Sequence, residues 1–423
     1  MNNKELLTNA GSVYVEYFEI LKANGPGLDV LPILESINIY EDVFSPFISG
    51  KAVIRDTLDI PNELGRSGND LIRLKVYTPS LKKQFHIEGY FYLYKIGERT
   101  LVKDRMQLYT LFFSSAELLT DINVHLSKQF KGTGDSIVQQ IAKKYYPDST
   151  KKILADPATN QIAYVSNFWT PSKNFSYIAD HSVSAKGTAS FMFFENREGL
   201  NFKELSSLAD SNIKPIQEFS GSDYTSTVQD EGMRAGSVTR DVSKEYNNIH
   251  GIRVDTTYDF IKDYMDGAIK SKLYSVDPIT KKIRWSIYDM QSTKNNLNAN
   301  LTYREDVIST TNPVIMTKNR GYGTFGLSET SNYRHVQRRT SYMRLLQSSK
   351  IEIDVYGRTD YTVGKKVKVV LNKLKSIVQS SSQEEILDQV YSGVYIITAI
   401  AHQITRESHK CTLELCKEST LLK

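Results

Sequence analysis

Apolar and polar residues alternate along much of the first hundred positions, a pattern typical of strands with one buried face. Ile72, Leu74 and Val76, for example, alternate with Arg73 and Lys75. Clusters of Gly, Pro, Asn and Asp separate these runs, as turn residues do between strands. The predicted strands cover residues 13–20, 34–40, 50–56, 72–76, 88–96 and 106–112. Strands this short and this closely spaced predict an antiparallel sandwich or a small barrel.

The period changes after residue 114, where apolar residues begin to recur at helical spacing. They fall on one face of two predicted helices, over residues 135–145 and 172–182. A hairpin is predicted next, with strands at 191–194 and 200–202. We therefore expect residues 115–220 to form a separate α+β domain.

Strands return after residue 221, but helical and polar segments interrupt them. A helix is predicted over residues 257–269, and the Asn-rich stretch 295–312 is interpreted as an insertion with loops. A cationic amphipathic helix over residues 334–346 follows. The remaining predicted strands cover residues 351–355, 367–371, 394–401 and 411–415. The Ser-rich segment 376–385 is predicted to be a flexible loop between two of them.

The cationic helix is the best candidate for an interaction surface in this sequence. Arginines surround its narrow apolar stripe, at Arg334, Arg338, Arg339 and Arg344. A helix of this charge suits contact with nucleic acid or with an acidic protein surface. The alternative is a helix face that is simply exposed to solvent.

Composition limits the classes of protein to consider. The chain has 423 residues, of which 40% are hydrophobic and 24% charged, so we expect a folded protein with two or three cores. A net charge of +5 and a pI near 8.8 give no support to a DNA-reading role. Cys411 and Cys416 are five residues apart, on opposite faces of a predicted strand, so they cannot pair there. With no signal-peptide core or long apolar stretch, synthesis in a reducing cytoplasm without membrane insertion is expected.

Catalytic and metal-binding motifs are absent from the sequence. The seven histidines show no metal-ligand spacing, and His402 and His409, which flank the last predicted hairpin, are assigned a structural or exposed role. No serine occupies a nucleophile elbow, and the glycine-rich stretch 321–326 lacks the Gly-Lys ending of a phosphate loop. Adjacent carboxylates are interpreted as solvated surface. We therefore predict no enzyme activity, no cofactor and no metal.

Short motifs occur in a particular order along nearly the whole chain. They lie at residues 39–42, 50–56, 68–72, 168–171, 191–195 with Gly199, 266–268, 275–277, 339–346, 353–357, 363–367, 392–397, His402 and 411–415. In this order they resemble the baseplate hub proteins of contractile-tailed phages, a family related to the hub part of type VI secretion spike proteins. No single motif is specific to the family, but the ordered set is.

The resemblance implies a β-rich α+β fold. It has two similar small antiparallel β-barrels like those of tail-tube proteins, an α+β middle domain and an inserted segment. The implied boundaries are residues 1–114 for the first barrel, 115–220 for the middle domain, 221–256 with 330–423 for the second barrel, and 257–329 for the insertion.

The resemblance also implies a function and partners. Family members form homotrimeric rings that adapt a sixfold tail tube above to a threefold spike below, around a channel through which DNA passes as cargo. Neighbouring baseplate wedge proteins are further expected contacts. Because the sequence ends at Lys423, soon after the last predicted strand, the spike is expected to be a separate polypeptide. The expected location is the tail baseplate of a virion assembled in the host cytoplasm. The alternative function is a tail-associated enzyme that degrades cell walls, or a glycan-binding module, on the same fold.

Overall fold

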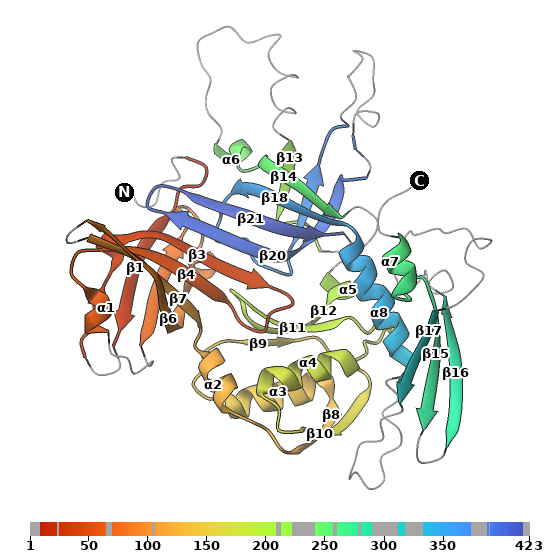
Figure 1. Cartoon of the computed structure of the whole chain (residues 1–423). Helices are drawn as coiled ribbons and strands as arrows, with labels where there is room; N and C mark the ends of the chain where they lie inside the picture. Colours follow the sequence, from red (N-terminus) through yellow and green to blue (C-terminus); the bar gives the residue numbers. More distant parts are fainter. Residues whose placement is uncertain are drawn as a thin grey trace, which may run out of the picture.

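The computed structural model describes most of the chain, and strands dominate it (Figure 1). The described residues are 9–22, 25–64, 70–103, 106–208, 213–221, 242–256, 260–277, 281–289, 312–317, 333–373, 387–388 and 390–417. One 13-stranded sheet and three smaller sheets account for the named strands. No helix in this part of the chain has both the length and the apolar character needed to cross a membrane.

The N-terminal part of the large sheet, the first module, folds around one core. Its strands are β1 (Tyr14–Leu21), β2 (Leu28–Asp29), β3 (Leu34–Asp42), β4 (Ser49–Asp56), β5 (Leu71–Tyr77), β6 (Ile87–Lys103) and β7 (Met106–Ser115). Short helical turns join them, namely η2 (Leu31–Ile33), α1 (Ile60–Glu63) and η3 (Lys83–Phe85). Their order is β3-β4-β7-β6-β5-β1-β2, and all pairs are antiparallel. The predicted alternation is confirmed in β5, where Ile72, Leu74 and Val76 are fully buried.

The C-terminal part of the sheet, the second module, closes on itself. Its strands are β13 (Gln217–Gly221), β14 (Asn248–Thr256), β18 (Lys350–Tyr356), β19 (Lys366–Val370), β20 (Gly393–Thr405) and β21 (His409–Cys416). They follow the order β19-β13-β14-β18-β21-β20, and β20 pairs again with β19, which completes a barrel. In one detail the sequence prediction was wrong: the barrel is not wholly antiparallel, because β13 runs parallel to both of its neighbours. Most of β13 also lies within the range predicted for the middle domain.

The two modules share one strand order. Reading along the chain, β1, β3, β4, β5, β6 and β7 correspond to β13, β14, β18, β19, β20 and β21. The spatial order β3-β4-β7-β6-β5-β1 then matches β14-β18-β21-β20-β19-β13 strand for strand. The modules differ in the direction of β13 and in the open edge between β1 and β3. At that edge β3 pairs with β20 instead, which joins the two modules into one sheet.

The middle domain packs two helices between small sheets. It contains α2 (Glu117–Asn123), β8 (Gln129–Thr133), α3 (Gly134–Tyr145), β9 (Ile153–Ala155), β10 (Gln161–Val165), α4 (Pro171–His181), β11 (Phe191–Asn196), β12 (Gly199–Glu204) and α5 (Leu205–Leu208). The two predicted helices and the hairpin are confirmed. Thr170 caps α4, since its Oγ1 accepts a hydrogen bond from the Lys173 amide, and a proline follows at the first helical position.

The segment between β14 and β18 adds a small sheet and two helices. It contains α7 (Phe260–Met265), β15 (Lys270–Asp277), β16 (Lys282–Asp289), β17 (Asn312–Thr317) and α8 (Tyr333–Ser348), and the short α6 (Val242–Glu245) precedes β14. The predicted cationic helix is α8. Of the helix predicted over 257–269, residues 260–265 form α7, residues 266–269 are not helical, and residues 257–259 lie outside the described part of the chain. Residues 295–311 of the predicted insertion loop and the loop 376–385 lie outside the described residues. This sheet projects from the side of the molecule (Figure 1).

Candidate functional site

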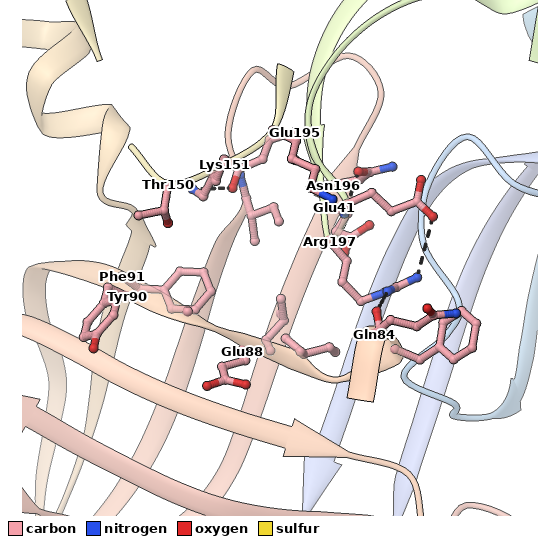
Figure 2. Close-up of a pocket in the computed structure, with 18 of the residues that line it drawn as sticks. Glu41, Gln84, Glu88, Tyr90, Phe91, Thr150, Lys151, Glu195, Asn196 and Arg197 are labelled. Carbon is pink, nitrogen blue, oxygen red and sulfur yellow. Dashed lines mark hydrogen bonds and ion pairs between the residues drawn. The ribbon is translucent and has the colours of Figure 1, made fainter. Parts of the chain in front are cut away.

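A cleft of about 610 Å³ lies where the first module meets the middle domain. Residues of β3, β6 and the β11–β12 turn line it, together with the segment before β9. The polar groups that line it include Glu41, Glu88, Lys151, Glu195, Asn196 and Arg197 (Figure 2). We call this feature the interdomain cleft. The sequence prediction did not include it, because its residues come from segments far apart in the chain.

A charge triad of one half-buried lysine and two buried carboxylates occupies one wall of the interdomain cleft. The Lys151 Nζ lies 2.5 Å from Glu117 Oε2 and 2.6 Å from Glu195 Oε1. Figure 2 shows Lys151 and Glu195 directed at each other. The other oxygen of Glu195 accepts a hydrogen bond from the Ile48 amide at 3.2 Å, so the triad also connects the middle domain to the first module.

Burial and charge oppose each other in this triad. Burial raises the pKa of Glu195, and Lys151 partly offsets that increase. Burial alone would lower the pKa of Lys151, but the carboxylates of Glu195 and Glu117 raise it above its ordinary value. The lysine is therefore held in its charged form, and the site is suited to holding the domains together.

Glu41 joins β3 to the second module. Its Oε2 accepts hydrogen bonds from the Thr362 hydroxyl and, at 3.1 Å, from the Val363 amide. The side chain is almost completely buried, and this burial raises its pKa to about 7 from an ordinary value of 4.5. Glu41 therefore keeps its proton at pH values at which an exposed glutamate, with a pKa of about 4.5, has already lost it.

Glu41 should make stability fall as the pH rises through the neutral range. The unfolded chain releases this proton near pH 4.5 and the folded chain only near pH 7, so between these values the folded state binds more protons. Replacing Glu41 with Gln should therefore raise the unfolding free energy by about 3 kcal/mol above pH 7 and leave it unchanged below pH 4. Urea titrations of both proteins across this pH range measure the difference, and parallel pH profiles would contradict the assignment.

The β11–β12 turn reaches both modules. The Arg197 Nη1 donates a hydrogen bond to the Gln84 carbonyl at 2.5 Å, and its guanidinium lies over the Phe85 ring at 5.4 Å. The neighbouring Asn196 Nδ2 donates to the Val363 carbonyl at 3.1 Å. The interdomain cleft is thus a junction at which Glu41, Lys151, Glu195 and Arg197 are bound within the chain.

The arginines of α8 contact the rest of the chain. Arg339 Nη1 donates to the carbonyls of Ala189 and Phe191 at 2.9 and 3.0 Å, and its Nη2 lies 2.7 Å from Asp180 Oδ1. Arg344 Nε lies 3.2 Å from Asp263 Oδ1.

Arg338 makes one longer bond, at 3.3 Å, to the Gly187 carbonyl. The side chain of Arg334 lies outside the described side chains. Arg338, Arg339 and Arg344 therefore fasten α8 to the middle domain and to α7. The prediction that the four arginines form a partner surface stays a prediction.

The structure also brings together His402, His409 and Cys411, whose polar atoms lie close enough to hold a metal ion. The sequence prediction assigned the histidines no ligand role. An alternating His-x-Cys at 409–411 facing a histidine across a hairpin is the signal that could have revealed them. Cys411 and Cys416 do not form a disulfide with each other, as predicted.

Comparison with known proteins gives one curated relative and several structural ones. No protein-family model matches the chain. The chain is 23% identical over 432 residues to the probable baseplate hub protein gp334 of Vibrio phage KVP40, and the alignment covers 96% of each protein. The chain resembles a phage baseplate hub protein. The resemblance predicted from the ordered motifs is thereby confirmed.

Two solved structures share the fold over nearly the whole chain. The tail protein of Neisseria meningitidis MC58 has a TM-score of 0.55 at 12% identity, with 96% of each chain covered. The 43 kDa tail protein of prophage MuSo2 from Shewanella oneidensis has a TM-score of 0.52 at 8% identity, covering 95% of this chain and 98% of its own. Sequence and fold together support a structural protein of a phage tail or baseplate.

Proposed function

We propose that three copies of this chain form a ring that adapts a sixfold tail tube to a separate threefold spike in a contractile phage tail. The ring surrounds part of the channel for DNA, which is a transient cargo, and contacts baseplate wedge proteins at its outer side. Assembly takes place in the host cytoplasm, and the mature location is the tail baseplate.

The observation that carries this proposal is the strand order shared by the first and second modules. A sixfold tube meets three chains without mismatch only if each chain offers two similar surfaces. Two modules with the same order of corresponding strands can supply them, because equivalent strand edges and loops then fall at equivalent positions. The direct pairing of β3 with β20 fixes the angle between the modules.

An exposed apolar face supports contact between copies. Ile283, Trp285 and Ile287 alternate along β16 and are 66%, 63% and 53% exposed. The intervening Ser286 donates a hydrogen bond to Gln337 of α8, so the three apolar residues lie on the face turned away from α8. On the neighbouring strand, Lys272 lies over the Trp285 ring at 5.0 Å. Contiguous exposed apolar surface of this kind marks interaction sites.

Trp285→Glu should weaken the trimer. An aromatic residue buried at an interface contributes about 2 kcal/mol or more, so association should weaken by about 30-fold or more. Sedimentation velocity over a concentration series measures the change. Leu101→Glu is the matched control, since Leu101 is 77% exposed on β6, far along the chain from β16, and should leave association unchanged. If both changes weaken association equally, β16 is not part of the interface between copies.

Light scattering tests the proposed assembly directly. The expected particle mass is three times 48.1 kDa, for the chain alone or with its spike bound. A monomeric or dimeric mass with the spike bound would overturn the ring. Incubation with peptidoglycan or glycans is expected to give background rates. Hydrolysis that is lost on changing one carboxylate would instead favour the enzyme alternative.

A further inference from the structure

Three potential ligand atoms converge inside the second module. Their residues belong to β20 and β21, which are adjacent strands (Figure 1). His402 lies directly opposite Cys411 in the strand pairing, and His409 precedes Cys411 by two residues on the same face of β21. His402 and His409 are 0% exposed, and Cys411 is 1% exposed.

The three atoms form a compact triangle. His402 Nδ1 lies 3.0 Å from His409 Nε2, and Cys411 Sγ lies 3.2 Å and 3.4 Å from these two nitrogens. Tetrahedral coordination with metal–nitrogen and metal–sulfur bonds of about 2.0 and 2.3 Å places such atoms about 3.3–3.6 Å apart. Outward movements of a few tenths of an ångström therefore make room for a cation.

Protons alone do not satisfy this cluster. Each ring nitrogen offers either one N–H or one lone pair in the ring plane, so the contact between the two nitrogens uses both. The S–H group of Cys411 then has no free lone pair on either facing ring nitrogen to which it can donate a hydrogen bond. Of the outer nitrogens, His409 Nδ1 is buried without a hydrogen-bond partner, and His402 Nε2 makes no hydrogen bond of ordinary geometry, although the Tyr361 backbone acts on that ring. Unpaired buried polar groups of this kind are costly unless another interaction compensates for them.

We propose that His402, His409 and Cys411 form a buried site for a thiophilic d10 cation, Cu⁺ or Zn²⁺. Two imidazoles and a thiolate are the ligands these ions prefer. Binding transfers the thiol proton to solvent as the metal–sulfur bond forms, with no change in oxidation state. With Cu⁺ the buried site is electrically neutral, and with Zn²⁺ it carries one positive charge, near Glu41, whose field acts on Cys411.

The surroundings agree with this chemistry. The Cβ of any other residue at Gly357 would lie 2.7 Å from His409 Nε2, so only glycine leaves room for the ring here. The His409 amide and carbonyl are bonded to Gly11 and Gly357, so metal binding would also fasten the N-terminal segment.

Metal analysis tests the site. The chain, carrying no histidine tag, is unfolded with a chelator and refolded under reducing conditions with Zn²⁺, Cu⁺ or Co²⁺, and bound metal is measured by mass spectrometry after desalting. We expect one equivalent per chain of Zn²⁺ or Cu⁺, a sulfur-to-cobalt absorption band with Co²⁺, and a higher Tm than that of the metal-free chain. The separate refolding experiments with Zn²⁺ and with Cu⁺ show which of these two ions the site binds.

Cys411→Ser should abolish stoichiometric binding and the cobalt band. Cys416→Ser is the matched control, because Cys416 is buried on the same strand beside Thr398 and should leave both unchanged. The cobalt spectrum of the unaltered chain tests for a thiolate ligand without any substitution, so this measurement does not depend on whether Cys411→Ser folds. A folded chain that takes up no stoichiometric metal, or binding that Cys411→Ser leaves intact, would overturn the proposal.

Discussion

Lys151→Ala is expected to lower the free energy of unfolding by about 3–5 kcal/mol, since removing one partner of a buried ion pair leaves uncompensated charge. The side chains of Glu117 and Glu195 are only 7% and 1% exposed, so without Lys151 these two carboxylates lose the cation that faces them both. The loss should shrink at acid pH, because burial raises the pKa of Glu195 and the carboxylate is neutralised as it takes up a proton. Denaturant titrations of Lys151→Ala and the unaltered chain, at neutral and at acid pH, measure this loss of stability.

Lys368→Ala is the matched control for this change. Lys368 also pairs with a carboxylate, Glu218, at 3.1 Å, but the two side chains are 46% and 55% exposed. An exposed pair contributes less than about 1 kcal/mol, so this change should have little effect. Similar losses for both lysines would mean that the triad does not hold the interdomain cleft together.

Arg339→Ala is expected to lower the free energy of unfolding by about 3–4 kcal/mol. Hydrogen bonds from a charged donor contribute about 1.5–3 kcal/mol each, and Arg339 donates to several carbonyls of the α4–β11 segment. Arg338→Ala removes one bond of 3.3 Å on the same helix and should cost about 1 kcal/mol or less. Thermal or chemical unfolding of the two variants gives the comparison.

The same pair of variants separates the two interpretations of α8. If its arginines form a partner surface, both changes should weaken association while stability stays near that of the unaltered chain. If they fasten α8 to the middle domain, Arg339→Ala should lower stability far more than Arg338→Ala does. Only the second pattern agrees with the contacts described for Arg339.

Local pattern predicted the elements better than their arrangement. The alternation of apolar residues located β1, β3, β4, β5, β6 and β7, because these strands have one face in a core and one face outside. The helices α3, α4 and α8 were also predicted, since each has an apolar face at helical spacing. Short strands such as β9 and β13 were missed, because three to five residues carry too little pattern to distinguish them from loops.

The sites depend on distant pairings that no local motif contains. Glu117, Lys151 and Glu195 belong to three separate elements of the middle domain, and only the folded chain brings them together. The His402–Cys411 contact depends on the register of β20 with β21, which a search for closely spaced ligands does not test. The direction of β13 is likewise set by its neighbours and not by its own residues.

Electron cryomicroscopy of the intact tail tests the central proposal most directly. We expect three copies of the chain at the end of the tube, with the first and second modules alternating around the ring at positions related by the sixfold symmetry of the tube. Superposition of the modules in that map should align β3-β4-β7-β6-β5 with β14-β18-β21-β20-β19. A hub with another number of copies, or a tube that contacts only one kind of module, would contradict the adaptor.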